Sequence, residues 1–175
     1  MDIIVSTLIK RGNDLFKKPS EKIKYTYNSD ADELLNDLQK YPHAYVLACI
    51  MDRQIRAERA WMIPYEIKTE IGTLDFQRLL NLSLAKIKEM FIKRKLHRFN
   101  EVMANNFYFG INRINDFYGG DASTIWKGSP KSATVVRRFL QFEGVGIKIA
   151  SMATNILARD FKIEMADKLC IDIST

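Results

Sequence analysis

In this 175-residue chain, the residues whose types and spacing best suit a chemical role surround a Gly-Val-Gly turn. Gly144, Val145 and Gly146 form the turn, and Lys148 follows two residues later. Two glycines let a backbone turn tightly and approach a partner closely. Apolar residues recur at helical spacing over residues 132–140 and 147–157, which predicts a helix on each side. The free backbone N–H groups at the start of the second helix can hold an anion.

Helix, glycine turn and helix in this order resemble the helix-hairpin-helix motif, which holds a backbone phosphate in DNA-binding proteins. With Lys148 two residues beyond the turn, the segment resembles the endonuclease III-like helix-hairpin-helix (HhH-GPD) DNA glycosylases. In that family a lysine here displaces a damaged base, forms a Schiff base with the sugar and so leads to nicking of the strand. The resemblance implies base-excision repair by a DNA glycosylase with AP lyase activity, with Lys148 as catalytic nucleophile. We expect its amine to be partly buried.

Two further segments match the family. Residues 47–60 are apolar and then polar, and Gln54 matches a glutamine that fills the space left by an extruded base. Residues 90–99 match a loop whose apolar wedge enters the base stack, which makes Leu96 the wedge candidate and His97 its DNA-binding neighbour. Alternatively, Gln54 belongs to a solvated loop, Leu96 is a core leucine at a basic helix end, and His97 is a surface histidine.

The family also has a catalytic aspartate downstream of its lysine, just before a further helix. The nearest match is Asp172, and Asp167 is a weaker alternative. The sequence stops three residues after Asp172, so we expect a truncated chain whose acid is either Asp172 or a residue beyond Thr175. The resemblance extends from residue 44 to the C-terminus. Tyr108 and Tyr118 are candidates to line the base pocket, and the damaged base itself is not predicted.

The cysteines and the charge distribution limit cofactors and partners. Two cysteines far apart, Cys49 and Cys170, do not supply the four that hold an iron–sulfur cluster in many family members, so we expect no cofactor or metal. Net charge is +6, and residues 81–148 hold twelve Lys/Arg against five Asp/Glu, which favours a polyanion partner. We expect that partner to be double-stranded DNA with a damaged base or an abasic site.

Two other functions remain open. A monofunctional glycosylase would remove the base by water attack, with Lys148 gripping only phosphate. A helix-hairpin-helix DNA-binding module without catalysis would keep the turn and lack the acid. No apolar run reaches membrane-spanning length and the N-terminus has no signal-peptide pattern, so we expect a cytoplasmic, nucleoid-associated monomer without a membrane partner.

Scarce turn residues (Gly 8, Pro 4) and little β-type alternation predict an all-α fold, here of the endonuclease III-like helical type. Residues 1–28 are expected to form an N-terminal helix and connector, and residues 29–175 the glycosylase-like domain. Besides the pair around the turn, helices are expected over residues 3–17, 29–40, 43–51, 57–71, 75–80, 83–93, 99–117 and 122–126. Ser29 or Asp30 is the expected N-cap of the second helix, and Pro64 is expected to kink or split the fourth.

Overall fold

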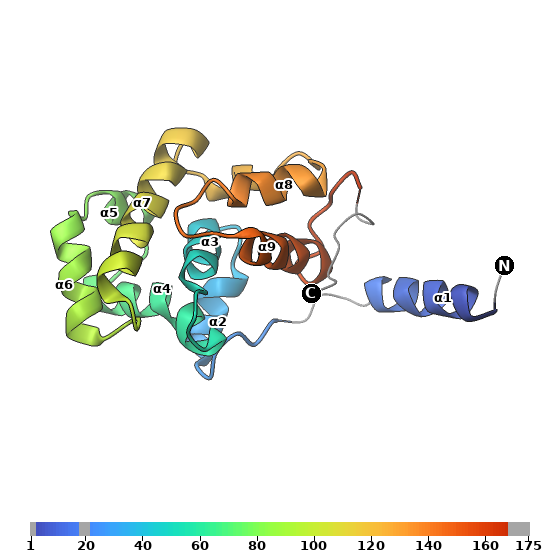
Figure 1. The fold of residues 1–175 in the computed structure, drawn as a ribbon, viewed down its shortest axis with the longest axis horizontal. Helices are drawn as coiled ribbons and strands as arrows, with labels where there is room; N and C mark the ends of the chain where they lie inside the picture. Colours follow the sequence, from blue (N-terminus) through green and yellow to red (C-terminus); the bar gives the residue numbers. More distant parts are fainter. Residues whose placement is uncertain (1–2, 18–21, 168–175) are drawn as a thin grey trace.

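All regular secondary structure in the described part of the chain is helical (Figure 1). The structure is a computed structural model that describes residues 3–17 and 22–167. The all-α prediction is therefore confirmed for these residues. The elements are α1 (Ile3–Lys17), α2 (Ser29–Asn36), α3 (Pro42–Met51), α4 (Ala57–Ile71), α5 (Phe76–Leu80), α6 (Leu84–Arg94), α7 (Asn100–Tyr118), the 3₁₀ helix η1 (Ala122–Ile125), α8 (Ser132–Phe139) and α9 (Ile147–Arg159).

The helices differ from expectation in two places, one at a helix end and one inside a helix. The N-cap of α2 is Asn28, neither Ser29 nor Asp30, because the Asn28 side chain accepts the backbone N–H groups of Asp30 and Ala31. Pro64 does not split α4, which runs through it without interruption. Proline removes one helix hydrogen bond, and Pro64 is itself buried on the packed side of α4. Tertiary packing thus overrides the local preference.

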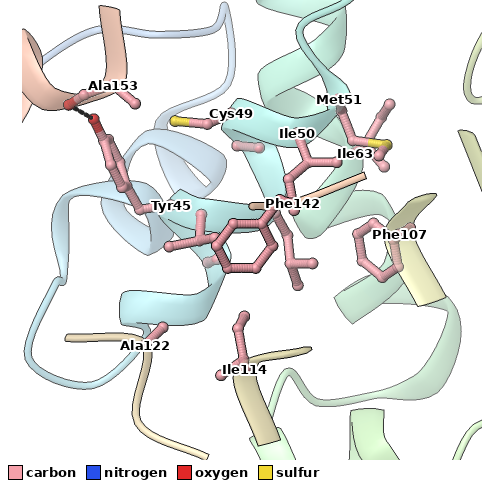
Figure 2. Close-up of a cluster of buried hydrophobic side chains, with 14 of the residues drawn as sticks. Tyr45, Cys49, Ile50, Met51, Ile63, Phe107, Ile114, Ala122, Phe142 and Ala153 are labelled. Atoms are coloured by element: carbon pink, nitrogen blue, oxygen red, sulfur yellow. Dashed lines mark hydrogen bonds between the residues drawn. The ribbon is translucent and has the colours of Figure 1, made fainter. Parts of the chain in front are cut away.

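Helix α3 is the centre of the core. All ten of its residues are buried, and α2, α4, α7, α9 and η1 pack around it. Figure 2 shows part of this core, where the Tyr45 hydroxyl of α3 donates to the carbonyl of Ala153 in α9 at 2.7 Å. On the other side, a Cβ added at Gly110 of α7 would lie 2.8 Å from Ile50 Cδ1, so glycine permits the close approach of α7 to α3.

The segment before α2 is fastened to the body of the protein. Tyr25 stacks on Trp61 of α4 with ring centroids 4.3 Å apart, and the Thr26 hydroxyl donates to Asp32 of α2 at 2.9 Å. In contrast, each side chain of α1 whose burial is described is exposed, and Figure 1 shows α1 apart from the other helices. The remaining elements therefore position the candidate site.

Candidate functional site

The glycine turn joins α8 to α9 and is anchored at its centre. Val145 is buried, and its backbone N–H donates to the carbonyl of Phe142 at 3.1 Å. Gly144 has φ +80°, and a Cβ there would lie 2.3 Å from Nδ2 of the buried Asn106 in α7. Gly146, the N-cap of α9, has φ −93° and open space where a Cβ would be. The left-handed φ and the close contact with Asn106 therefore favour glycine at position 144. At position 146, the absence of a side chain leaves the backbone N–H groups accessible to a partner.

A single open cavity of about 740 Å³ lies between this turn and the segment that follows α3. Five of the residues expected to act together line it, namely Gln54, Gly144, Val145, Gly146 and Lys148. The cavity thus joins two segments that are far apart in the sequence. Its other lining residues are the polar Asp52 and Arg53 and the apolar Ile55, Ile149 and Met152. Apolar walls with a few convergent polar groups are typical of ligand sites.

Lys148 is the second residue of α9, where the first helical turn begins. Its side chain is exposed, so the expectation of partial burial is wrong. The backbone around it carries the unpaired N–H groups of a helix N-terminus, which favour anions. The amine is therefore accessible from solvent beside a backbone suited to a phosphate.

Asp52 is a lining residue that the sequence did not single out. It is half-buried after the last turn of α3, and burial raises the pKa of its carboxyl group. The polar contact with the Trp61 side chain and the positive charge of Lys148 act in the opposite direction and lower that pKa. Nothing in its own neighbourhood of sequence indicates that Asp52 shares a cavity with a residue of α9.

Gln54 is exposed and has φ +54°, in the left-handed region that residues other than glycine seldom adopt. The chain enters this conformation directly after two short turns, in which Asp52 N–H donates to the Cys49 carbonyl and Arg53 N–H to the Met51 carbonyl. The side chain of Gln54 therefore projects from a tightly held backbone at the edge of the cavity, where insertion into a partner is sterically possible.

Leu96 and His97 are placed differently from the wedge prediction. Leu96 is 5% exposed and belongs to the core, and His97 is 1% exposed. Both predictions of a DNA contact therefore need correction, because a wedge must reach the partner while these side chains face inward. The alternative that Leu96 is a core leucine holds, whereas the alternative that His97 lies on the surface is also wrong.

The buried ring of His97 supports the local backbone. Its Nδ1 accepts the backbone N–H of Phe99 at 3.1 Å, and the ring lies near the carbonyls of Met51 and Arg53. Burial lowers the pKa of His97, and these carbonyls partly oppose that effect. His97 therefore packs beside the turn that carries Asp52 without lining the cavity, and its buried Nε2 has no hydrogen-bond partner among the described residues.

Of the two expected acids, only Asp167 belongs to the described residues, and it does not line this cavity. Asp172 is outside the described residues. Asp167 is described, and its Oδ1 accepts the backbone N–H of Ser132 at 2.5 Å, which caps the start of α8. Tyr108 and Tyr118 do not line the cavity either, and Tyr118 instead stacks on Phe142 with ring centroids 6.2 Å apart. Within the described residues, Asp52 is the carboxylate among the cavity's lining groups.

Part of the positive charge of residues 81–148 is neutralised in the fold. Lys93 pairs with Glu70 at 3.0 Å, and Arg94 pairs with Glu66 and Glu70, which ties α6 to α4. Glu66 and Glu70 lie outside residues 81–148, so these pairs reduce the excess counted for that segment. The sequence excess therefore overstates the charge available to a polyanion, and Arg53 and Lys148 supply charge at the cavity itself.

Among the described residues, no cluster of three or more metal-ligating side chains is present. None of the described helices combines the length and apolar character that crossing a membrane requires. Comparison of the chain with protein-family models, curated protein sequences and solved structures gave no match.

Proposed function

We propose that this protein is a DNA base-excision repair glycosylase with AP lyase activity, of the endonuclease III-like helix-hairpin-helix type. The observation that carries the proposal is the shared cavity, where the Lys148 amine, the Gln54 side chain and the glycine turn meet although they come from distant parts of the chain. An accessible primary amine, a bare helix N-terminus and a projecting amide are the groups that such a reaction on duplex DNA uses.

The backbone of the turn holds the DNA in this proposal. Gly146 has no side chain between solvent and the N–H groups that begin α9, so a phosphate can approach this backbone closely. The exposed Arg53, whose Nη1 would lie 3.6 Å from a Cβ at Gly144, adds a second positive charge beside the turn. Gln54 then fills the space vacated when the damaged nucleotide leaves the stack, which lowers the cost of extrusion.

The Lys148 amine performs the chemistry. Its nitrogen attacks C1′ of the damaged nucleoside, the base leaves with the electrons of the glycosidic bond, and the resulting Schiff base permits β-elimination and strand nicking. A carboxylate near C1′ stabilises the positive charge that develops on the sugar. Asp172 remains the proposed acid for that step.

Substitution of the amine tests the chemistry directly. Lys148→Gln should abolish both strand nicking and borohydride trapping on DNA with an abasic site, with circular dichroism unchanged. Lys131→Gln is the matched control, because the Lys131 side chain is also exposed, makes no cap hydrogen bond to α8 and does not line the cavity. If the wild-type chain binds duplex DNA but forms no trapped adduct on any lesion tested, the catalytic function is wrong and the DNA-binding module is favoured. Base removal without trapping would favour the monofunctional glycosylase.

Binding has its own test. Affinity for duplex DNA should fall with rising salt concentration, because each phosphate contact releases counterions. Gly146→Val should weaken binding to every sequence alike and leave the fold intact, since a Cβ at this position meets no protein atom within 4 Å. Unchanged affinity for this variant would exclude the turn as the phosphate site.

A further inference from the structure

Two short turns hold the backbone on either side of Asp52. It follows the fully buried α3, its backbone N–H donates to the carbonyl of Cys49 at 3.1 Å, and the next N–H, of Arg53, closes a second turn on Met51. His97, in the loop before α7, lies near the carbonyls of Met51 and Arg53, although its buried Nε2 has no hydrogen-bond partner among the described residues. The backbone at Asp52 is therefore held in a defined turn, and its half-buried side chain lines the cavity together with Lys148.

A carboxylate is out of place in a site that serves phosphate binding alone. Negative charge in the cavity repels a phosphate and cancels part of the attraction exerted by Lys148 and Arg53. The same negative charge stabilises any positive charge that forms close to it. Asp52 thus disfavours a pure phosphate grip and favours chemistry that places positive charge on the lysine nitrogen.

We propose that Asp52 is a positioning residue that orients Lys148 across the cavity and stabilises positive charge on its Nζ during the lyase reaction. This inference rests on the proposed function. In that reaction Nζ bonds to C1′ while the glycosidic bond breaks, its electron pair leaves with the base, and the base takes up a proton that Nζ loses. The C1′–O4′ bond then opens, O4′ takes a proton from water, and the nitrogen lone pair forms the C=N bond, which leaves one positive charge on Nζ.

The charged and titratable groups around Asp52 come from three sides. Lys148 lies on α9, and Arg53, the residue after Asp52, lines the same cavity. The buried Cys49 thiol belongs to the last turn of α3, which ends just before Asp52. Trp61 contacts the carboxylate from α4. Lys148 lines the same cavity as Asp52, and its positive charge lowers the pKa of the Asp52 carboxyl group. A direct measurement of that interaction therefore tests the pair without requiring any enzymatic activity.

The first experiment is a carboxyl ¹³C NMR titration of Asp52 in the full chain. Lys148→Gln should raise the pKa of Asp52, because the lysine charge that lowers it is removed. Lys148→Arg should preserve the wild-type titration, and so should the control Lys131→Gln. A titration of Asp52 that is unchanged in Lys148→Gln would overturn the pair.

The second experiment measures borohydride trapping on abasic-site DNA. Asp52→Asn should slow adduct formation at saturating DNA on the order of tenfold or more, through loss of the stabilising charge. The same variant should bind abasic DNA as tightly as the wild type or more tightly, because a repulsive charge is gone. Asp52→Glu should recover part of the rate. A merely structural role for Asp52 would weaken both steps together.

The outcomes separate the inference from the proposed function. Adduct formation by Asp52→Asn at the wild-type rate contradicts the role of Asp52 while the lyase stands. A wild-type chain that shows the NMR interaction but never forms an adduct contradicts the lyase, and with it the stabilising role, while the Asp52–Lys148 pair stands. If Asp52→Asn fails to fold, as judged by circular dichroism, the Lys148→Gln and Lys148→Arg titrations decide.

Discussion

At the scale of single residues, Gln54 carries an unfavourable backbone conformation. A left-handed φ at a residue with a Cβ costs about 1–2 kcal/mol, and here two short turns and the buried end of α3 impose it. Strain of this kind is often concentrated at functional sites. Substitutions at position 54 can therefore distinguish the effect of backbone strain on stability from the effect of the side chain on base excision.

Gln54→Gly and Gln54→Ala test that separation. Glycine should raise the free energy of unfolding by up to about 1 kcal/mol, because it relieves the left-handed conformation. Alanine retains the strain and should not stabilise. Both variants should lose more base-excision activity on duplex DNA than on single-stranded DNA, since only the duplex has a vacated stack to fill. Equal losses on the two substrates would leave Gln54 with a structural role alone.

The two glycines of the turn should respond in opposite ways. Gly144→Ala should lower the free energy of unfolding by roughly 1–3 kcal/mol, because it combines a left-handed φ with a close contact to Asn106. Gly146→Ala should change it little, since that position is open and has an ordinary φ. Urea unfolding of both variants measures the difference. Equal destabilisation would mean that the hairpin is held differently from this description.

Residue patterns and the resemblance to a known family predicted part of the site. The Gly-Val-Gly turn, Lys148 and Gln54 were found because each belongs to a recognisable local pattern, and the structure places them around one cavity. Leu96 and His97 were misplaced, since a short stretch with four basic residues gives no sign of which side chain turns inward. Asp52 and Asn106 were missed because their significance depends on partners that are distant in sequence.

At the scale of elements, the approach of α7 to α3 determines how the site is supported. Asn106 of α7 contacts Gly144 of the turn, so α7 sets the position of the hairpin as well as that of the core. Four residues later, Gly110 allows α7 to lie against Leu47 and Ile50. Any side chain at position 110 pushes against a helix that is buried on all sides.

Gly110→Leu should therefore destabilise the protein by roughly 1–3 kcal/mol through overpacking, despite the higher helix propensity of leucine. Gly12→Leu is the matched control, because Gly12 also lies inside a helix but has open space around it. Thermal unfolding should show a lower midpoint for the first variant alone. A Gly110→Leu variant as stable as the wild type would show that α3 and α7 can separate without cost.

Helix positions were largely predictable, because apolar periodicity and cap residues are local. The N-cap Asn28 and the continuation of α4 through Pro64 were not predicted. In each case neighbouring residues favour different local structures, and packing in the folded chain decides between them. The relation between elements was even less accessible. No periodicity indicates that the end of α3 and the start of α9 share a cavity.

At the scale of the whole molecule, both histidines of the chain are buried, and burial lowers the pKa of each. The His43 ring is also bonded through Nε2 to the Leu74 carbonyl at 2.7 Å. An unfolded histidine takes up a proton near pH 6.5. The folded chain resists that proton at both positions, so acid favours the unfolded state.

Stability should therefore be constant above the unfolded-state pKa and decline as the pH falls below about 6.5, by up to about 1.4 kcal/mol per pH unit for each histidine. The decline from the histidines ends once the pH has passed their lowered folded-state pKa values. Asp52 acts with the opposite sign, because its raised pKa lets the folded state bind a proton first. Urea unfolding between pH 8 and pH 5 measures the change in the free energy of unfolding with pH. His97→Gln should reduce that change by the contribution of one histidine. A free energy of unfolding that stays level across this range would show that the folded and unfolded chains bind protons equally, which would contradict the lowered pKa values of the two histidines.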